Sequence, residues 1–289
     1  MHKFVNPGSP LLDILHKYFA SGYPSLQEPQ PKPSRLYFDR VARRHCNHHH
    51  PCGNAPARAV QVQNQGARHL LSEQPPPTKP GLVHVYPEDN NEKLVPNGTG
   101  DQRGWIEGWL LTPQDATNVN LIKAPKGLLW NYNQSLEIYK CPADKSAVKL
   151  GGRMIPRVRS ISMNGNMNGD SWYTAEIKNT HYTFKKTSEI INPSPSQAFV
   201  FLDEHPDGID DGYFLVFVNR KQTWGNLPAN YHNSAWGFSF ADGHAEIRKW
   251  KDPDSLSRKI VANAKGPTDV PWIQVRTSAP IKDGTPWPP

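Results

Sequence analysis

The sequence predicts an α+β protein in which an antiparallel β-sheet forms the core and the N-terminal third is disordered. Strand-like segments gather between residues 158 and 250, after short helical patterns. The 289 residues include 29 prolines and 21 glycines, and the mean hydropathy is −0.68, so apolar side chains cannot supply a core throughout. We therefore expect a folded domain at residues 86–252, a largely disordered segment at 1–85 and a loose tail at 253–289.

The charge balance argues against a nucleic-acid partner. The formal charge of +7 arises from 33 Lys and Arg against 26 Asp and Glu, but the basic residues are scattered and form no stripe with interleaved aromatics. No stretch approaches the roughly 18 consecutive apolar residues of a membrane-spanning helix. Residues 1–20 also lack the basic start and apolar run of a signal peptide. As written, the chain is expected to be soluble.

Residues 22–80 are rich in Pro, Gln, Arg and His without a helical or strand period, which predicts coil. Within them lie thiol and imidazole groups of the kind that bind zinc or copper: Cys46, His48, His49, His50 and Cys52. Neighbouring histidines in a coil rarely converge on one ion, so we favour the interpretation without a metal. The remaining cysteine, Cys141, precedes a proline and is expected to be structural.

Folded structure is predicted to begin near Tyr86, where turn-forming Asn and Gly residues precede an apolar cluster at 105–110. Residues 124–139 suit one short helix, which Pro142 would end. Val158–Asn164 then alternates apolar and polar residues as a strand does.

Two continuous apolar runs, Ala198–Glu204 and Tyr213–Val218, are separated by a turn-rich stretch, which predicts two adjacent strands. Two further strand segments flank Asp242 and Gly243. This pair favours a type I′ hairpin, because both turn residues need positive φ. Beyond Asp252 the chain has one short apolar patch and many prolines, so we expect a helical turn followed by loose extended chain.

Three segments carry a resemblance to a known family. Glu88–Asn97 reads EDNNEKLVPN, and Tyr139–Ser146 reads YKCPADKS, with RVRSISMNG following at Arg157–Gly165. In the third segment nine residues separate a histidine from an Asp-Gly pair, and this motif comprises His232, Asp242, Gly243 and His244. In this order the segments resemble bacterial pseudopilin-like proteins with a C-terminal H-x9-DG domain, and they cover a little over half of the chain.

The resemblance implies a pilin-like headpiece and a structural role in a type II secretion or pilus-like apparatus. It implies partners among other pseudopilin or secretion-apparatus subunits, and a location at the inner membrane, in the periplasm or at the cell surface. No cofactor and no enzymatic activity are expected. The alternatives are an extracellular module that binds polysaccharide or another ligand, and a metal-dependent hydrolase.

Such proteins resemble type II secretion pseudopilins in having a basic leader, a Gly-Phe peptidase site, a Glu shortly after it and a long apolar helix. This chain shows none of these before Glu88. We infer that the segment is a pilin helix translated in the wrong frame. Read from the second base of each codon, Arg35–Arg44 can become GFTLIELLVV and His45–Ala59 can become IAIITILAAMLLPAL, and the run stays compatible through His84. As written, the product is therefore expected to be unable to assemble.

Oxygen-rich side chains at the end of the first apolar run and in the turn after it suggest a cation site, with Ca²⁺ as the ion: Asp203, Glu204, Asp207, Asp210 and Asp211. The segment lacks the alternating spacing of a calcium loop, so we favour a solvated hairpin loop. His232, Asp242 and His244 suggest acid–base chemistry, and together with Asp203 a hydrolase. No Ser or Cys lies in a nucleophile motif, and we expect His232 to fix the Asp242–Gly243 turn instead.

The nine tryptophans are expected to lie mostly in the core, where aromatic rings bury a large apolar area. A few partly exposed ones at one end of the sheet would favour the ligand-binding alternative, for which the candidates are Trp105, Trp109, Trp130, Trp172, Trp224, Trp236 and Trp250.

Overall fold

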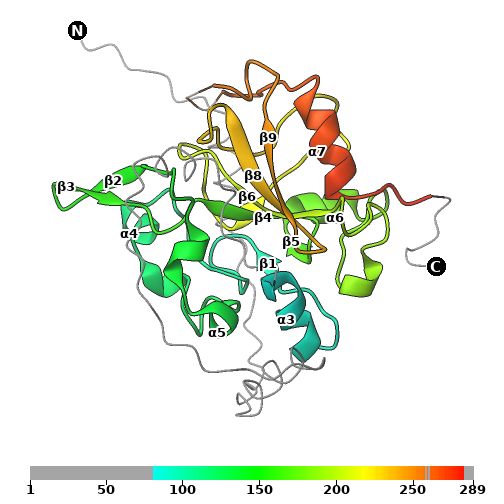
Figure 1. Ribbon diagram of the computed structural model, residues 1–289, viewed down its shortest axis with the longest axis horizontal. Coiled ribbons are helices and arrows are strands. Elements are labelled where there is room, and N and C mark those ends of the chain that lie inside the picture. The colour runs from blue at the N-terminus through cyan, green and yellow to red at the C-terminus, as the bar shows by residue number, and fades with distance from the viewer. Residues whose placement is uncertain (1–80, 258, 260, 283–289) are drawn as a thin grey trace, which may run out of the picture. The chain divides into compact units, whose positions relative to one another are not determined.

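The computed structural model describes residues 81–257, 259 and 261–282 (Figure 1). The predictions for residues 1–80, including the segment from Cys46 to Cys52, lie outside these residues. Within the described ranges, no helix combines the length and the apolar character needed to cross a membrane.

A five-stranded sheet organises the described chain, in the order β7-β4-β6-β8-β9 (Figure 1). Each strand overlaps a segment that the sequence predicted to be a strand, so the expectation of an α+β fold with a sheet is confirmed. The strands are β4 (Ile161–Asn164), β6 (Phe199–Asp203), β7 (Tyr213–Phe214), β8 (Ala235–Phe240) and β9 (Ala245–Lys249).

The predicted pairing of the two apolar runs is wrong. β4 lies between β6 and β7, and β7 runs parallel to β4, whereas all the other neighbours in this sheet are antiparallel. Both edges of β6 are occupied, one by β4 and the other by β8, so the chain leaving β6 cannot fold back beside it. β7 is therefore added at the free edge of β4.

The central strands are buried on both faces. Every residue of β4, β6 and β8 is buried. β6 contains a β-bulge, at which the register against β8 shifts between Phe199 and Phe201. As a result Val200 and Phe201 both face one apolar cluster, while Phe199 and Leu202 face the other. The bulge sets which side of the sheet each following residue faces.

The β8–β9 hairpin is present, but its turn is not type I′. Gly243 has a φ of +94°, whereas Asp242 is not among the residues with positive φ. The Gly243 N–H donates to Phe240 O at 2.9 Å, and the Phe240 N–H donates to His244 O at 3.0 Å. This is a three-residue loop that needs one left-handed residue. Two consecutive positive φ values occur instead at Asn233 and Ser234, just before β8.

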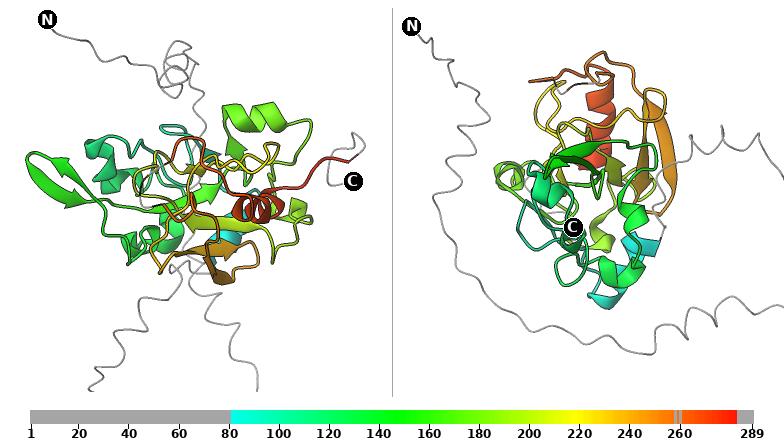
Figure 2. Two further views of the ribbon diagram at one scale, coloured as in Figure 1. Left: turned by 90° about the horizontal axis from the view of Figure 1, so that it is seen from above. Right: turned by 90° about the vertical axis from the view of Figure 1, so that its left-hand side faces the viewer.

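The described residues after Asp252, which end at Lys282, are not the loose tail that the sequence predicts. It contains α7 (Asp269–Thr277), and Val270 and Ile273 are fully buried in the apolar cluster beneath this helix. Figures 1 and 2 show α7 lying beside the β8–β9 side of the sheet. The prolines of this region lie outside the helix except Pro271, which is in its first turn, where a missing N–H costs little.

Short elements connect the sheet to the rest of the chain. The single helix predicted for residues 124–139 is instead α5 (Trp130–Asn133) and a 3₁₀ helix (Leu136–Tyr139), because Gln134 between them adopts a left-handed conformation. The hairpin of β2 and β3 projects away from the sheet in Figures 1 and 2. The remaining helices and strands are α3 (Gly81–Asp89), β1 (Asn97–Gly98), α4 (Pro113–Ala116), a 3₁₀ helix (Val119–Leu121), β2 (Ala147–Leu150), β3 (Arg153–Pro156), β5 (Gly169–Asp170), α6 (Trp172–Ile177) and a 3₁₀ helix (Thr187–Glu189).

Candidate functional site

The residues of the H-x9-DG motif do not form one site. His232 lies three residues before β8, and Asp242 lies two residues after it. The six residues of β8 span about 20 Å at the usual rise of a strand, which separates the two ends of the motif. The expectation that His232 fixes the Asp242–Gly243 turn is therefore wrong, and so is the acid–base group of His232, Asp242 and His244.

His232 instead meets Cys141 and Asp203 at the other end of the sheet. Cys141 Sγ lies 3.2 Å from His232 Nε2. One ligand atom from each of the three side chains can be chosen so that all lie within 4.8 Å of one another, and all three side chains are buried. In the described part of the chain, this is the only group of three or more Cys, His, Asp or Glu side chains this close together.

Hydrogen bonds of the Ser160 hydroxyl and of the main chain position this cluster. Cys141 follows the 3₁₀ helix Leu136–Tyr139 and is tied to the start of β4, since its N–H donates to Ser160 Oγ at 2.8 Å. The Ser160 hydroxyl in turn donates to Asp203 Oδ1 at 3.0 Å. Asp203 ends β6, and its carbonyl accepts from the Ala229 N–H at 2.9 Å, which holds the chain that leads to His232. Ser160 thus links two members of the cluster.

Burial dominates the electrostatics of the cluster. It raises the pKa of the Asp203 carboxyl to about 7, against the hydrogen bond from Ser160, which lowers it. Burial, followed by the nearby Asp203 charge, raises the pKa of the Cys141 thiol to about 12. A thiol with this pKa is protonated at neutral pH, which is the opposite of an activated nucleophile. Burial and then the charges of Asp144 and Asp203 also raise the pKa of Tyr231.

The acids that suggested a cation site do not all lie together. Asp203 belongs to the cluster above, whereas Glu204 accepts from Ser162 Oγ at 2.6 Å and from Asn226 Nδ2 at 2.7 Å. Asp207 is exposed. Asp211 accepts from the Tyr213 N–H at 2.8 Å. Most of the acids of this segment are buried, so it is not the solvated turn that the sequence favoured.

A buried arginine lies among these acids. Arg159 is 1% exposed, and burial lowers its pKa to about 10, while Asp211, Glu204 and Asp210 act to raise it. Burial, and then repulsion from Asp210, raises the pKa of Asp211 well above its usual value. The guanidinium therefore compensates negative charge in the interior.

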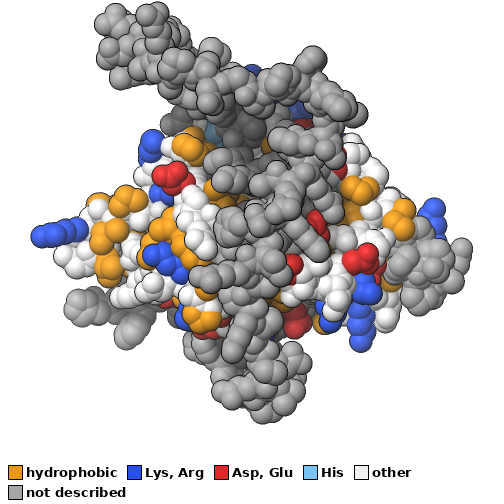
Figure 3. Space-filling view, turned by 60° about the horizontal axis from the view of Figure 1, so that its bottom comes forward, with side chains coloured by type: hydrophobic (Ala, Val, Ile, Leu, Met, Phe, Trp, Pro, Cys, Tyr) orange, Lys and Arg blue, Asp and Glu red, His pale blue; other side chains and the backbone are white. Residues whose placement is uncertain are grey.

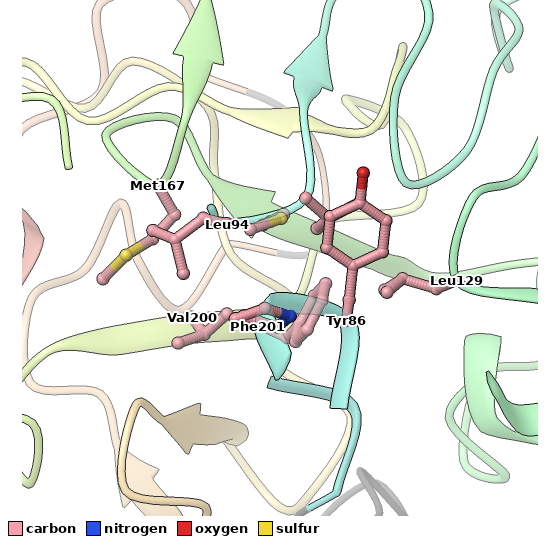
Figure 4. Close-up of a pocket in the computed structure, with 9 residues that line it drawn as sticks. Tyr86, Leu94, Leu129, Met167, Val200 and Phe201 are labelled. Carbon is pink, nitrogen blue, oxygen red and sulfur yellow. The ribbon is translucent and has the colours of Figure 1, made fainter. Parts of the chain in front are cut away.

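The pocket lined by Tyr86, Leu94 and Phe201 is apolar and has a volume of about 10 Å³ (Figure 4). This space is no larger than one water molecule needs, and far smaller than a typical ligand pocket. The tryptophans give little support to a binding platform: among the described ones, Trp105, Trp224, Trp236 and Trp250 are buried, and Trp172 is the most exposed at 40%.

Sequence reasoning missed Cys141 and Ser160 as members of the cluster. Both lie in segments that carried the family resemblance, YKCPADKS and RVRSISMNG, but nothing in their spacing indicated that they would meet His232. No family model matches this chain, and no match exists among the curated proteins or the solved structures that were compared.

Proposed function

We propose that residues 86–252 form the headpiece of a pseudopilin-like structural subunit of a type II secretion or pilus-like apparatus. The observation that carries the proposal is the meeting of Cys141 and Ser160, from the second resembling segment, with His232, from the third. All three are buried. Motif residues that meet inside one folding unit support a role in maintaining a shared scaffold.

The same observations favour a structural role over catalysis. The three side chains of the cluster are at most 8% exposed, which leaves little access for a substrate. The apolar pocket beside Tyr86 has room for about one water molecule. On the face drawn in Figure 3, the visible Lys and Arg side chains are scattered among acidic and hydrophobic ones.

The extracellular-binding alternative depends on Trp172. Its ring lies 6.4 Å from that of Phe217, and the Arg220 guanidinium is 3.9 Å from the Phe217 ring centroid. A single partly exposed tryptophan is a weaker platform than the several stacked rings that sugar recognition favours. Retention of the protein on an immobilised polysaccharide, lost in Trp172→Ala, would revive this alternative.

The first test is to sequence the coding DNA from Ser25 to Asn90. The proposal expects two compensating single-base shifts, between which the other frame encodes Gly-Phe followed by an apolar run. A frame interrupted by stop codons or charged residues would remove the inferred pilin helix, and with it the main argument for assembly.

The second test compares the chain as written with a chain in which the frame is restored, both expressed in a bacterium with a type II secretion system. We expect only the restored chain to fractionate with the membrane and to cross-link to pseudopilins through its apolar segment. A restored chain with one Asp in the apolar run is the matched control and should lose both properties. Membrane association of the chain as written, or no cross-linking of the restored chain, would contradict the proposal.

A further inference from the structure

We propose that Cys141, Asp203 and His232 form a zinc site, in which the thiolate, one carboxylate oxygen and one ring nitrogen are three of the four ligands of a single Zn²⁺ ion. Sulfur, nitrogen and oxygen donors of these residue types are the usual protein ligands of zinc. The inference concerns this cluster alone, so a chain that binds zinc here need not assemble into a filament.

The spacing of the donor atoms suits one small ion. Zinc–ligand distances of 2.0–2.3 Å in a tetrahedral site place neighbouring donor atoms about 3.5 Å apart. The observed separation of 3.2 Å between Cys141 Sγ and His232 Nε2 is close to this value. The third donor, from Asp203, lies within 4.8 Å of both. A small side-chain movement would bring all three protein donors to the ion, and a water molecule would occupy the fourth tetrahedral position.

Asp203 supplies an independent indication of a ligand. Its side chain is fully buried, and Oδ2 has no hydrogen-bond partner in the described structure, although Oδ1 accepts from Ser160. A buried polar atom without a partner costs free energy. Coordination of a cation by this oxygen would remove that cost.

Charge balance favours a divalent ion. A Cys thiolate and an Asp carboxylate carry two negative charges, and neutral imidazole carries none, so the site with Zn²⁺ is neutral overall. A neutral complex avoids much of the large penalty for burying an isolated charge. Binding replaces the Cys141 thiol proton, and any proton on Asp203, with zinc–sulfur and zinc–oxygen bonds, and releases these protons to solvent.

The donor set also distinguishes zinc from the calcium that the sequence suggested. Ca²⁺ prefers six to eight oxygen ligands, whereas this cluster offers one carboxylate together with sulfur and nitrogen. Ser160 is the outer partner that such a site requires, because its hydroxyl binds Asp203 and its Oγ accepts from the Cys141 N–H. Calcium at millimolar concentration should therefore fail to compete.

The test uses Co²⁺ as a spectroscopic substitute for zinc, with the full-length chain. The protein has three cysteines, so the variant Cys46→Ser/Cys52→Ser retains Cys141 as its only thiol. We expect this background to bind one cobalt ion with a near-ultraviolet thiolate-to-cobalt charge-transfer band, and one equivalent of Zn²⁺ to abolish the band. Zinc should also raise the melting temperature.

Variants on this background identify the ligands. Cys141→Ser should abolish the charge-transfer band. Asp203→Asn and His232→Gln should each weaken cobalt binding at least 10-fold. Ser160→Ala should lower the affinity for cobalt roughly 10- to 100-fold. His244 lies at the other end of β8, so His244→Gln is the matched control and should retain the full affinity for cobalt.

If the folded Cys46→Ser/Cys52→Ser protein shows no charge-transfer band with cobalt, the proposal is overturned. This result needs no substitution within the cluster, so it does not depend on whether the ligand variants fold. Unchanged affinity in a folded Asp203→Asn or His232→Gln variant would also overturn it. Circular dichroism of each metal-free variant establishes that the fold is retained.

Discussion

The side chains of Asp252 and Asp269 bind each other's backbone: each carboxylate accepts hydrogen bonds from the N–H of the other aspartate and from the N–H of the residue before it. Asp252 Oδ2 accepts from the N–H groups of Thr268, at 2.9 Å, and Asp269, at 2.6 Å. Asp269 Oδ2 accepts from the N–H groups of Lys251 and Asp252, both at 2.9 Å. Both aspartates are buried, and Arg248 Nη2 lies 3.5 Å from Asp269 Oδ1. This reciprocal arrangement joins the end of β9 to the start of α7.

Asp269→Ala should therefore lower the free energy of unfolding by about 3 kcal/mol, because the buried Asp252 N–H, the half-buried Lys251 N–H and Arg248 lose a charged acceptor. Urea unfolding followed by circular dichroism measures the change. Asp207→Ala removes an exposed carboxylate and is the control, with an expected change within about 0.5 kcal/mol. Equal effects of the two substitutions would show that the Asp252–Asp269 arrangement does not hold α7 in place.

Arg159→Met should destabilise the protein by about 3–5 kcal/mol, since it leaves buried acids without their compensating cation. The control is Arg153→Met, at an exposed position, which should change stability by less than about 0.5 kcal/mol. If Arg159→Met destabilises the protein no more than the control does, the buried acids are protonated, and therefore uncharged, even without the guanidinium.

The loss caused by Arg159→Met should also depend on pH. Burial and then Asp210 raise the pKa of Asp211, and Glu204 and Arg159 face the same group. A carboxyl with a raised folded-state pKa contributes stability that is present below its unfolded pKa and is lost as pH rises through the folded pKa. Removing Arg159 raises that pKa further, so unfolding curves should show a larger deficit at about pH 8 than at about pH 5.

The strands could be predicted because their apolar patterns are local, but the side of the sheet on which a residue lies could not. The bulge at Val200 and Phe201 places two successive side chains on one side. It therefore decides that Asp203 meets Ser160 while Glu204 meets Ser162. No pattern in a continuous apolar run reveals a bulge, because every residue of the run is apolar whichever side it faces.

The cluster of Cys141 and His232 could not be predicted for a different reason. The two residues are 91 positions apart, and their meeting depends on the order of strands in the sheet. The sequence suggested β6 beside β7, whereas β6 lies between β4 and β8. This order, with β6 antiparallel to both neighbours, brings the start of β4, the end of β6 and the chain before β8 to one end of the sheet.

Gly243→Ala should destabilise the β8–β9 hairpin by about 1–2 kcal/mol, because Gly243 has a φ of +94°, which a residue with a Cβ adopts only under strain. Gly243→Asn should cost less, since asparagine tolerates left-handed backbone better than alanine. Chemical denaturation of both variants tests the order. Equal costs would indicate that the added side chain, and not the backbone conformation, causes the loss.

His244 should have a raised pKa that depends on Asp242. Its Nδ1 lies 2.6 Å from Asp242 Oδ1, and its Nε2 lies 3.2 Å from Glu246 Oε1. Partial burial acts to lower the pKa of His244, but the hydrogen bonds to these two carboxylates outweigh burial and raise the pKa. For Asp242, burial acts to raise the pKa, but the hydrogen bonds from His244 outweigh it and lower the pKa.

The stability that the protonated ring contributes is fully present below the unfolded pKa of His244 and is lost as pH rises through the folded pKa. An NMR titration of the ring protons should therefore place the midpoint above that of a free histidine, and Asp242→Asn should lower it. Asp207→Asn, in an exposed loop elsewhere, should leave the midpoint unchanged. A His244 midpoint unaffected by Asp242→Asn would show that the carboxylate does not hold the ring in solution, and the hairpin turn would then depend on Gly243 and on its main-chain hydrogen bonds.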